Sequence, residues 1–328
     1  MVNVAIAGGT GHIGRTIVDV LGEDPGHKAI ILSRKENGRL DDGAEIIAVD
    51  YKNVAAIQET LEKYNIDTVV SCLMILDDDS GKAQVNLIEA AAASSATNRI
   101  IVSDYSLPYP DETKKDVPYT IWRQRGFEEA KKTNLQVTRF WNGLWLDYYA
   151  SPSLKSYMKE PAYALDIANR MAGIPGDGNQ PIVFTYSYDV ARFLRALLDE
   201  PKWPETSIVI GNKITLNEFV KKAEEARGTS IAKFEFRRVT NEMIGRKFEV
   251  HYDTVEKLKT HQVTELPSHH ELYGFISKES IQRIFAVTGQ WMVSGAFDLP
   301  DEDTLNKMFP DIETLTVESM LEKCWKGK

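Results

Sequence analysis

The stretch VAIAGGTGHIGRTIVDVLG, residues 4–22, constrains the fold of this chain more than any other. A short β-rich run ends in closely spaced glycines, and the residues after them place Ile13, Ile17, Val18 and Leu21 at helical spacing. Glycines between a strand and a helix allow backbone N–H groups and the positive end of the helix to approach a phosphate. The stretch therefore predicts a strand, a turn and a helix that bind a dinucleotide.

These glycines fit two spacings, and each spacing is typical of a different group of dinucleotide-binding proteins. Gly9, Gly11 and Gly14 give G-x-G-x-x-G, the fingerprint of dehydrogenase-type domains. Gly8, Gly11 and Gly14 give G-x-x-G-x-x-G, with Thr10 inside the loop. The loop by itself is compatible with both.

The rest of the first half mixes predicted strands with predicted helices. Apolar runs such as KAIILS, AEIIAVD and DTVVSCL are interspersed with helical patterns such as VAAIQETLEKYN and GKAQVNLIEAAAASS. This order predicts right-handed crossovers and an α/β fold, a Rossmann-type doubly wound parallel sheet. We expect this domain over residues 1–150 and a smaller C-terminal α/β cap, mainly binding substrate, over 151–328. Strand and helix patterns near 181–226 predict a partial return to the first domain.

Charge and composition argue against several functions. The net charge is −9 and no run of Lys and Arg forms a stripe, so we expect no nucleic-acid partner. The two cysteines, Cys72 and Cys324, give neither a disulfide framework nor a metal-binding pair. The longest apolar stretch is too short to span a bilayer. These features predict a cytoplasmic protein, a monomer or a homodimer, that binds no metal and no membrane.

The end of the second predicted strand indicates which dinucleotide binds. Sites for NAD place a carboxylate there for the ribose hydroxyls, whereas an arginine accommodates the 2′-phosphate of NADP. This chain has Ser33, Arg34 and Lys35, a hydroxyl and two cations that suit a phosphate dianion. The interpretation therefore favours NADP(H), although the carboxylate of Glu36 would suit NAD. The alternative is that these residues form a solvated basic turn.

The sequence resembles the NmrA-like family of atypical short-chain dehydrogenase/reductases, to which the isoflavone reductases belong, and its fungal members in particular. The resemblance rests on GGTGHIG, on DYKN after the third strand and on IIVSDYS at the fifth. It extends more weakly through YSYDVARFLRALLDEPKW and TELPSHHELYGF. In this family the spacing that counts is G-x-x-G-x-x-G.

The resemblance implies a set of cofactor-binding residues, carried over position by position. Those for the pyrophosphate are Gly8, Thr10, Gly11, His12, Ile13 and Gly14. Those for the adenosine half are Arg34 and Lys35 at the 2′-phosphate, Asp50 near adenine, and Ser71, Cys72 and Leu73 under the ribose. Those for the nicotinamide half are Ser103, Asp104 and Tyr105 at the ribose, and Trp141, Asn142 and Gly143 beside the ring.

One departure from the family bears on catalysis. Short-chain reductases usually carry Tyr-x-x-x-Lys, in which the lysine keeps a tyrosine acidic enough to donate a proton, and related reductases retain the lysine. This chain reads VPYTIWRQRGFEEAKK, which puts the lysine position at Ile121 or Arg123. Tyr119 and Arg123 form Tyr-x-x-x-Arg. A guanidinium can hold ribose hydroxyls or keep a phenol acidic, but its pKa is too high for it to carry a proton itself.

Tyr119, Arg123, Tyr105 and Asp104 are therefore candidates for catalysis, and Arg123 is the partner of Tyr119. Tyr119 is either the general acid or an ordinary half-buried tyrosine at the start of a helix. Tyr105 is either a proton donor or a ring that packs over the cofactor, since it follows a strand whose end faces the ligand crevice. Asp104 is either a general base or a turn residue.

Aromatic residues gather after the predicted sheet, at Trp141, Trp145, Tyr148, Tyr149 and Tyr157. If they wall a pocket, the substrate is bulky and apolar; if they form a domain interface, they carry no such information. We favour the pocket. The leading interpretation is an NADPH-dependent reductase of an enone, carbonyl or imine in a bulky aromatic or alkaloid-like small molecule of secondary metabolism. The alternatives are an NADP(H)-bound cyclase or isomerase without redox chemistry, and a non-catalytic NADP(H) sensor.

Overall fold

The computed structural model describes residues 2–34, 38–40, 43–150, 152–158, 163–228 and 247–328. Its main sheet has eight strands, paired in parallel except at β3 and β4. In spatial order they are β12 (Thr206–Ile208), β7 (Gln136–Trp141), β6 (Arg99–Ile101), β5 (Thr68–Ser71), β1 (Val2–Ala7), β2 (His27–Ser33), β4 (Glu45–Ala48) and β3 (Gly38–Arg39). Chain order runs outward from β1 on both sides, apart from the edge strand β3, which precedes its neighbour β4 in the chain. The predicted doubly wound Rossmann-type fold is therefore confirmed.

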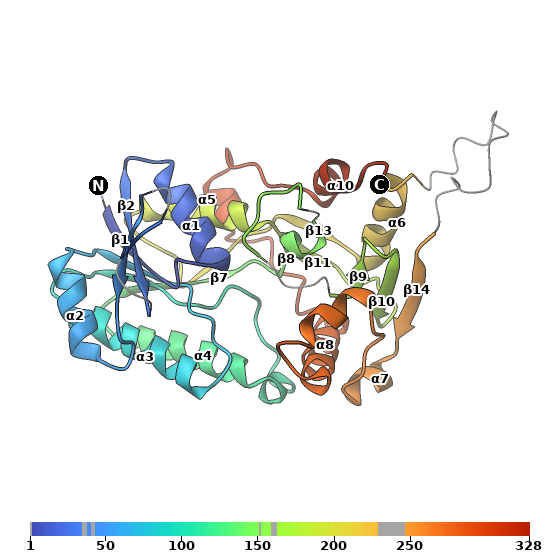
Figure 1. Cartoon of the computed structure of the whole chain (residues 1–328), viewed down its shortest axis with the longest axis horizontal. Helices are drawn as coiled ribbons and strands as arrows, with labels where there is room; N and C mark the ends of the chain where they lie inside the picture. The colour runs from blue at the N-terminus through green and yellow to red at the C-terminus, as the bar shows by residue number, and fades with distance from the viewer. Residues whose placement is uncertain (1, 35–37, 41–42, 151, 159–162, 229–246) are drawn as a thin grey trace.

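Helices cover both faces of this sheet (Figure 1). On one face α1 (His12–Gly22) packs against α5 (Ser187–Leu198). On the other face α3 (Asp78–Ala93) packs between α2 (Val54–Lys63) and α4 (Pro118–Lys131). Strands such as β5, with four buried residues in succession, therefore carry apolar side chains toward both layers.

Side-chain caps begin several of these helices where the sequence offers them. Asn53 accepts from the N–H of Ala56 at the start of α2. Asp77 and Ser80 form a capping box at the start of α3. The acceptors satisfy N–H groups that would otherwise lack partners, so the helix starts are set by local sequence.

The second half of the chain builds part of the cap, returns to the main sheet and then completes the cap. The strand β12 pairs with the sheet edge at β7, and α5 covers α1. Two small sheets make up the cap, β13 (Asn212–Ile214), β11 (Ile182–Thr185) and β8 (Leu144–Trp145), and β14 (Glu249–Asp253), β10 (Met171–Pro175) and β9 (Leu165–Asp166). Its helices are α6 (Leu216–Ala226), α7 (Val255–Lys259), α8 (Lys278–Val293) and α10 (Val317–Trp325), whereas α9 (Leu305–Met308) lies against β12 of the main sheet. Single 3-10 turns are η1 (Lys114–Asp116), η2 (Leu146–Tyr149) and η4 (Pro267–Leu272).

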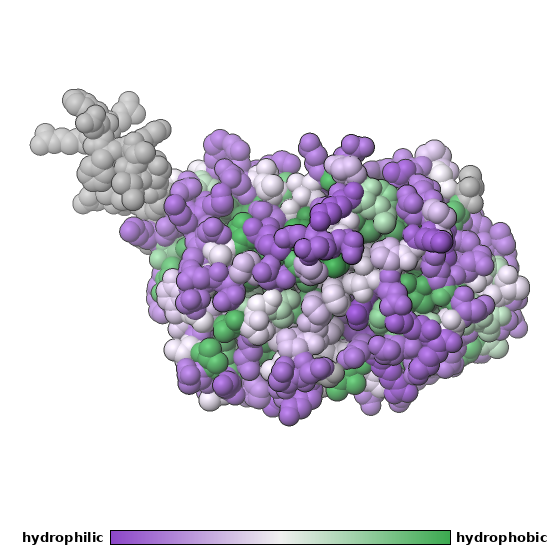
Figure 2. Space-filling view, turned by 180° about the vertical axis from the view of Figure 1, so that it is seen from behind, coloured by the Kyte–Doolittle hydropathy of each residue, from purple (hydrophilic) through white to green (hydrophobic). Residues whose placement is uncertain are grey.

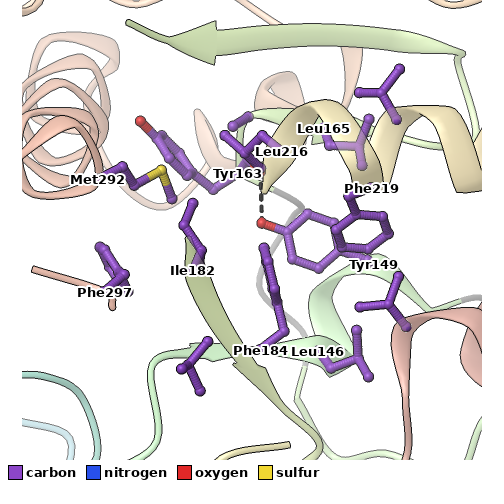
Figure 3. Packing of buried hydrophobic residues seen from close by; sticks show 14 of the residues in the cluster. Leu146, Tyr149, Tyr163, Leu165, Ile182, Phe184, Leu216, Phe219, Met292 and Phe297 are labelled. Atoms are coloured by element: carbon purple, nitrogen blue, oxygen red, sulfur yellow. Dashed lines mark hydrogen bonds between the residues drawn. The ribbon is translucent and has the colours of Figure 1, made fainter. Parts of the chain in front are cut away.

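Aromatic rings form the centre of the cap core (Figure 3). Tyr149 lies 5.6 Å from Phe184 and 5.0 Å from Phe219, measured between ring centres, and is 1% exposed. Its hydroxyl donates to the carbonyl oxygen of Tyr163 at 2.8 Å. Trp145, 8% exposed, packs in the core under α1 and α5. The expectation that the aromatic stretch walls a pocket is therefore wrong for Tyr149 and Trp145, because both rings fill cores.

The surface seen in Figure 2 is mostly hydrophilic, with apolar side chains in several small separate areas. Over the part of the chain that the structure describes, no helix combines the length and the apolar character needed to cross a membrane.

Candidate cofactor and active site

The glycine loop lies between β1 and α1, against the residues that follow β5. Gly8 has a φ of +84°, and a Cβ on it would lie 2.6 Å from the carbonyl oxygen of Cys72. A Cβ on Gly14 would overlap the carbonyl oxygen of Gly8. Gly9 is tight as well, since a Cβ there would lie 3.0 Å from the Ile31 side chain. Gly8 and Gly14 therefore need glycine for close packing of the loop on the sheet, whereas a side chain on Gly9 would require the neighbouring isoleucines to shift.

Gly11 differs, because a Cβ on it would meet no heavy atom within 4 Å. It precedes α1, and no side-chain hydrogen bond from the described residues caps that helix. Its neighbour Thr10 is exposed, and His12 has a φ of +48°. Ile13, by contrast, is 7% exposed and packs into the core. An open loop beside uncapped N–H groups fits the pyrophosphate of a dinucleotide.

The end of β2 carries the residues expected at the 2′-phosphate. Ser33 is 8% exposed, and Arg34 follows it at the surface. Tyr51 lies beneath them, and its hydroxyl donates to the carbonyl oxygen of Leu32 at 3.1 Å. Lys35 lies outside the described residues. A guanidinium at this strand end suits a phosphate on the adenosine ribose.

The residues expected at the rest of the adenosine half are placed in different ways. Asp50 is exposed, and its Oδ1 accepts from the N–H of Lys52 at 2.9 Å. Ser71 is fully buried and donates to Oε1 of Gln84 at 3.0 Å, so its hydroxyl braces β5 against α3. Leu73 is partly buried against the core on that face.

Gln84 also fixes the end of β6. Its Oε1 accepts from the backbone N–H of Ser103 at 2.8 Å. The Ser103 hydroxyl donates to the carbonyl oxygen of Leu73, also at 2.8 Å. The ends of β5 and β6, which lie beside the ligand crevice, are therefore held together by two side chains.

Tyr105 is buried beneath the glycine loop, beside the partly buried Cys72. Its hydroxyl lies 3.5 Å from Sγ of Cys72, and its ring packs against Phe140 and Trp145 at 5.9 and 6.5 Å. Burial raises the pKa of Tyr105 well above its usual value and raises the pKa of the Cys72 thiol to about 12. Both groups are therefore neutral at neutral pH.

A carboxylate, two phenols and a guanidinium form a cluster after β6. Tyr109 donates from Oη to Oδ1 of Asp104 at 3.1 Å and accepts from Nη1 of Arg123 at 3.0 Å. The guanidinium carbon of Arg123 also lies 4.8 Å from the centre of the Tyr119 ring. The structure thus brings three of the four predicted catalytic residues together around Tyr109, and leaves Tyr105 with Cys72.

Burial and charge act in opposite directions on Asp104. The side chain is fully buried, and Nη1 of Arg139 lies 3.6 Å from Oδ2. Burial raises the pKa of Asp104, and it outweighs the lowering by Arg123 and Arg139. Burial likewise raises the pKa of Tyr109, against the charge of Arg123. Among the described residues, Oδ2 of Asp104 has no hydrogen-bond donor.

The start of α4 is fixed by a close contact with α3. The Trp122 ring lies against Gly81, where a Cβ would overlap it, and Nε1 donates to Oδ1 of Asp78 at 2.8 Å. On this helix Ile121 is 49% exposed, whereas Arg123 reaches the cluster. Of the two positions considered for the family's lysine, Arg123 is the one that contacts a phenol.

The end of β7 supplies a buried amide. Asn142 is fully buried, and neither Oδ1 nor Nδ2 has a hydrogen-bond partner among the described residues. Gly143 follows Asn142 with a φ of +67°. Trp141 precedes Asn142, and the Arg139 guanidinium lies 4.6 Å from the centre of the Trp141 ring. Buried amides normally have partners, so this one fits a ligand with both a donor and an acceptor, such as nicotinamide.

Two residues of the site, Tyr109 and Arg139, were not predicted. The signal for Tyr109 was its place five residues after Asp104 in DYSLPYP, a segment whose prolines indicate a turn. Arg139 lies within an ordinary strand pattern and gave no signal.

Comparisons with known proteins agree with this fold and with the binding of a nicotinamide dinucleotide. A family model described as NAD(P)H-binding matches residues 8–142. The chain is 31% identical to oxidoreductase swnN of Metarhizium robertsii, across 100% of this chain and 98% of that protein. It is 30% identical to oxidoreductase BOA1 of Botryotinia fuckeliana, across 95% and 96%. The solved complex of leucoanthocyanidin reductase from Vitis vinifera with NADPH has a TM-score of 0.71 at 19% identity, with 98% of each chain covered.

Proposed function

Because the chain belongs to the NmrA-like, isoflavone reductase-like family of NADP(H)-dependent oxidoreductases, we propose that it reduces bulky aromatic or alkaloid-like small molecules. The reacting group of the proposed substrate is an enone, a carbonyl or an imine. One of the similar structures is named a leucoanthocyanidin reductase, and the proposed substrate class follows it as an analogy of fold.

One observation carries the proposal. The open glycine loop and the cluster of Asp104, Tyr109 and Arg123 lie at the same end of the parallel strands. In open α/β sheets this edge, at the switch in strand order, is where ligands bind. A cofactor held by the loop would therefore extend toward a set of groups that can hold and move a proton.

We propose that the cap, mainly residues 151–328, covers the substrate, while residues 1–150 with β12 and α5 hold the cofactor. A direct contact between the two parts supports this division. The Trp291 ring of α8 lies 5.4 Å from the ring of Tyr109, and its Nε1 donates to Oγ1 of Thr113 at 2.6 Å. The cluster thus lies at the junction of sheet and cap, a common place for small-molecule sites.

The proposed roles of the remaining residues follow from their contacts. Gly8, Gly11 and Gly14 shape the pyrophosphate site, Ser33 and Arg34 bind the 2′-phosphate, and Asn142 binds the carboxamide. The bound cofactor supplies a hydride. Tyr119, stacked on Arg123, lines the site, and the Tyr105 ring supports the glycine loop from below through Cys72.

The proposal is tested by incubating the protein and NADPH with three probes, trans-chalcone, naphthaldehyde and dihydroisoquinoline. We expect loss of the reduced-nicotinamide absorbance with at least one probe, and a product that has gained two hydrogens by mass spectrometry. A variant that cannot bind the cofactor, Gly8→Val, serves as the control. Bound NADPH in calorimetry with no oxidation by any aromatic enone, aldehyde or imine would contradict the proposed substrate class.

A further inference from the structure

The cluster after β6 contains a phenol that bridges a carboxyl group and a guanidinium and lies against the cap. Tyr109 receives a hydrogen bond from Arg123 and gives one to Asp104, and its ring lies against Trp291 of the cap. Tyr109 is partly buried, so it is neither in the core nor on the open surface. Ser106 also interacts with this hydroxyl, so a substrate that takes the proton replaces the Ser106 contact.

We propose that Tyr109 is the catalytic residue that gives the substrate its proton, that Asp104 replaces this proton, and that Arg123 stabilises the phenolate in between. The proposal rests on the proposed reductase function. It assigns the missing general acid to a residue outside the Tyr-x-x-x-Arg segment, and it leaves Arg123 with the part that a lysine has in related enzymes.

The proton balance is complete with groups that the site contains. As the substrate carbon gains a hydride, the O–H bond of Tyr109 breaks and a new bond forms to the substrate oxygen, nitrogen or α-carbon. The acid O–H of Asp104 then breaks and restores the phenol across the 3.1 Å contact, with the direction of that hydrogen bond reversed. Water later returns a proton to Asp104. Each turnover consumes one NADPH and one proton.

Asp104 is suited to return a proton to Tyr109 because its surroundings favour the protonated carboxylic acid. It is fully buried, and the donor nearest to its Oδ2, Nη1 of Arg139, lies 3.6 Å away, beyond hydrogen-bond distance, so burial of the carboxylate is incompletely compensated there. The charged and titratable groups that face it are Arg123 from α4, Arg139 from β7 and Tyr109 from the following loop. The two guanidiniums stabilise the carboxylate that each turnover leaves behind. Burial keeps the pKa of Asp104 raised, so the carboxylate binds a proton again between turnovers.

The first test needs neither cofactor nor substrate. A protonated, buried carboxylic acid has a carbonyl-stretch band in the infrared that a carboxylate lacks. We expect this band in the difference between wild type and Asp104→Asn above the pH at which ordinary carboxyls ionise, and we expect Tyr109→Phe to shift it. If the band were absent from the difference spectrum, or if Tyr109→Phe left it unshifted, the proposed proton transfer from Asp104 to Tyr109 would be overturned.

The second test uses NADPH with the probe that the wild type reduces. We expect Tyr109→Phe to lower kcat about 100-fold or more, the usual range for loss of a general acid, with NADPH affinity unchanged in calorimetry. The matched control is Tyr252→Phe, which removes a phenol from β14 in the cap. Full activity of Tyr109→Phe would overturn the assignment. Inactivity of the wild type toward every probe would instead contradict the proposed function. The infrared experiment would still test the proton transfer between Asp104 and Tyr109, because it needs no substrate.

The supporting residues are tested by the pH profile. The wild-type rate is expected to fall as pH rises through the pKa of Asp104, because only the protonated form of Asp104 can return a proton to Tyr109. Asp104→Asn is expected to be slow and to lose this dependence. Arg123→Lys, which keeps the cation, is expected to retain more activity than Arg123→Met. Equal rates for these two variants, or an unchanged pH profile in Asp104→Asn, would contradict the positioning roles.

Discussion

Arg34 is the side chain on which the choice between NADPH and NADH rests. It is exposed at the end of β2, so it is available to a phosphate. Charge-assisted hydrogen bonds contribute about 1.5–3 kcal/mol, so Arg34→Ala should weaken NADPH binding about 10–100-fold in calorimetry and leave NADH binding unchanged. The control is Arg39→Ala, since Arg39 donates to the carbonyl oxygen of Gly43. Equal affinities of the wild type for the two cofactors would contradict the assignment.

Gly14 tests the close packing of the loop. Its Cβ would overlap the carbonyl oxygen of Gly8, so Gly14→Ala must displace the loop. We expect NADPH affinity to fall at least tenfold and the free energy of unfolding to fall by about 1–3 kcal/mol, the usual cost of overpacking. Gly22→Ala in the same helix is the control, because nothing lies within 4 Å of its Cβ position. Helix propensity favours Ala over Gly at both positions, so a similar loss in the two variants would contradict the role of loop packing.

Cys72 should be unreactive at neutral pH. Its pKa is raised to about 12 by burial, and the nucleophile in alkylation is the thiolate. We expect iodoacetamide to leave Cys72 unmodified in the folded protein at neutral pH, and to label it as pH rises toward 12 or after unfolding, as followed by peptide mass spectrometry. Fast labelling at neutral pH would indicate that the loop opens.

Some site residues could be predicted from the sequence, and others could not. The glycines, Arg34 and Arg123 could be found because their roles depend on local spacing. Tyr109 could not, because its partners Asp104 and Arg123 come from the end of a strand and from a helix. Tyr149 was misassigned because an aromatic ring in a pocket wall and one in a core look the same in sequence.

At the scale of elements, the contact between α3 and α4 sets the position of Arg123. Trp122 lies on Gly81, so Gly81→Ala should separate the helices. We expect a loss of about 1–3 kcal/mol in the free energy of unfolding and a lower kcat, because Arg123 moves with α4. Lys82→Ala, at the next and exposed position, is the control. An unchanged stability and kcat in Gly81→Ala would show that Trp122 adapts without moving the helix.

Elements of the main sheet were predictable to the extent that they are long. The seven residues of β2 and the twelve of α5 carry clear periodicity. The strands β3, β8 and β9 have two residues each, too few for any pattern, and their pairing depends on partners distant in sequence. The cap was therefore expected as a region, without its two sheets.

At the scale of the whole molecule, Trp291 connects the cap with the cluster. It stacks on Tyr109 and donates to Thr113. Trp291→Phe keeps an aromatic ring and loses the hydrogen bond, so we expect a loss of about 1–3 kcal/mol in stability and a change in KM for the probe larger than the change in NADPH affinity. Trp203→Phe, which removes an indole hydrogen bond to Leu197 far from the cap, is the control. Equal changes in both binding steps would argue against a role for the cap in substrate binding.

The position of β12 has a consequence for how this protein can be divided. The chain leaves the main sheet after β7, builds part of the cap, and returns with α5 and β12 before completing it. A fragment of residues 1–150 would leave β7 as an unpaired edge and uncover the apolar side of α1, so we expect it to aggregate on expression. A fragment extended to residue 228 supplies both missing pieces and should remain in solution longer in gel filtration. Exchange of caps between relatives would thus require replacement of interior segments while β12 stays, and joining two chains at a single crossover near residue 150 would break the cofactor-binding half.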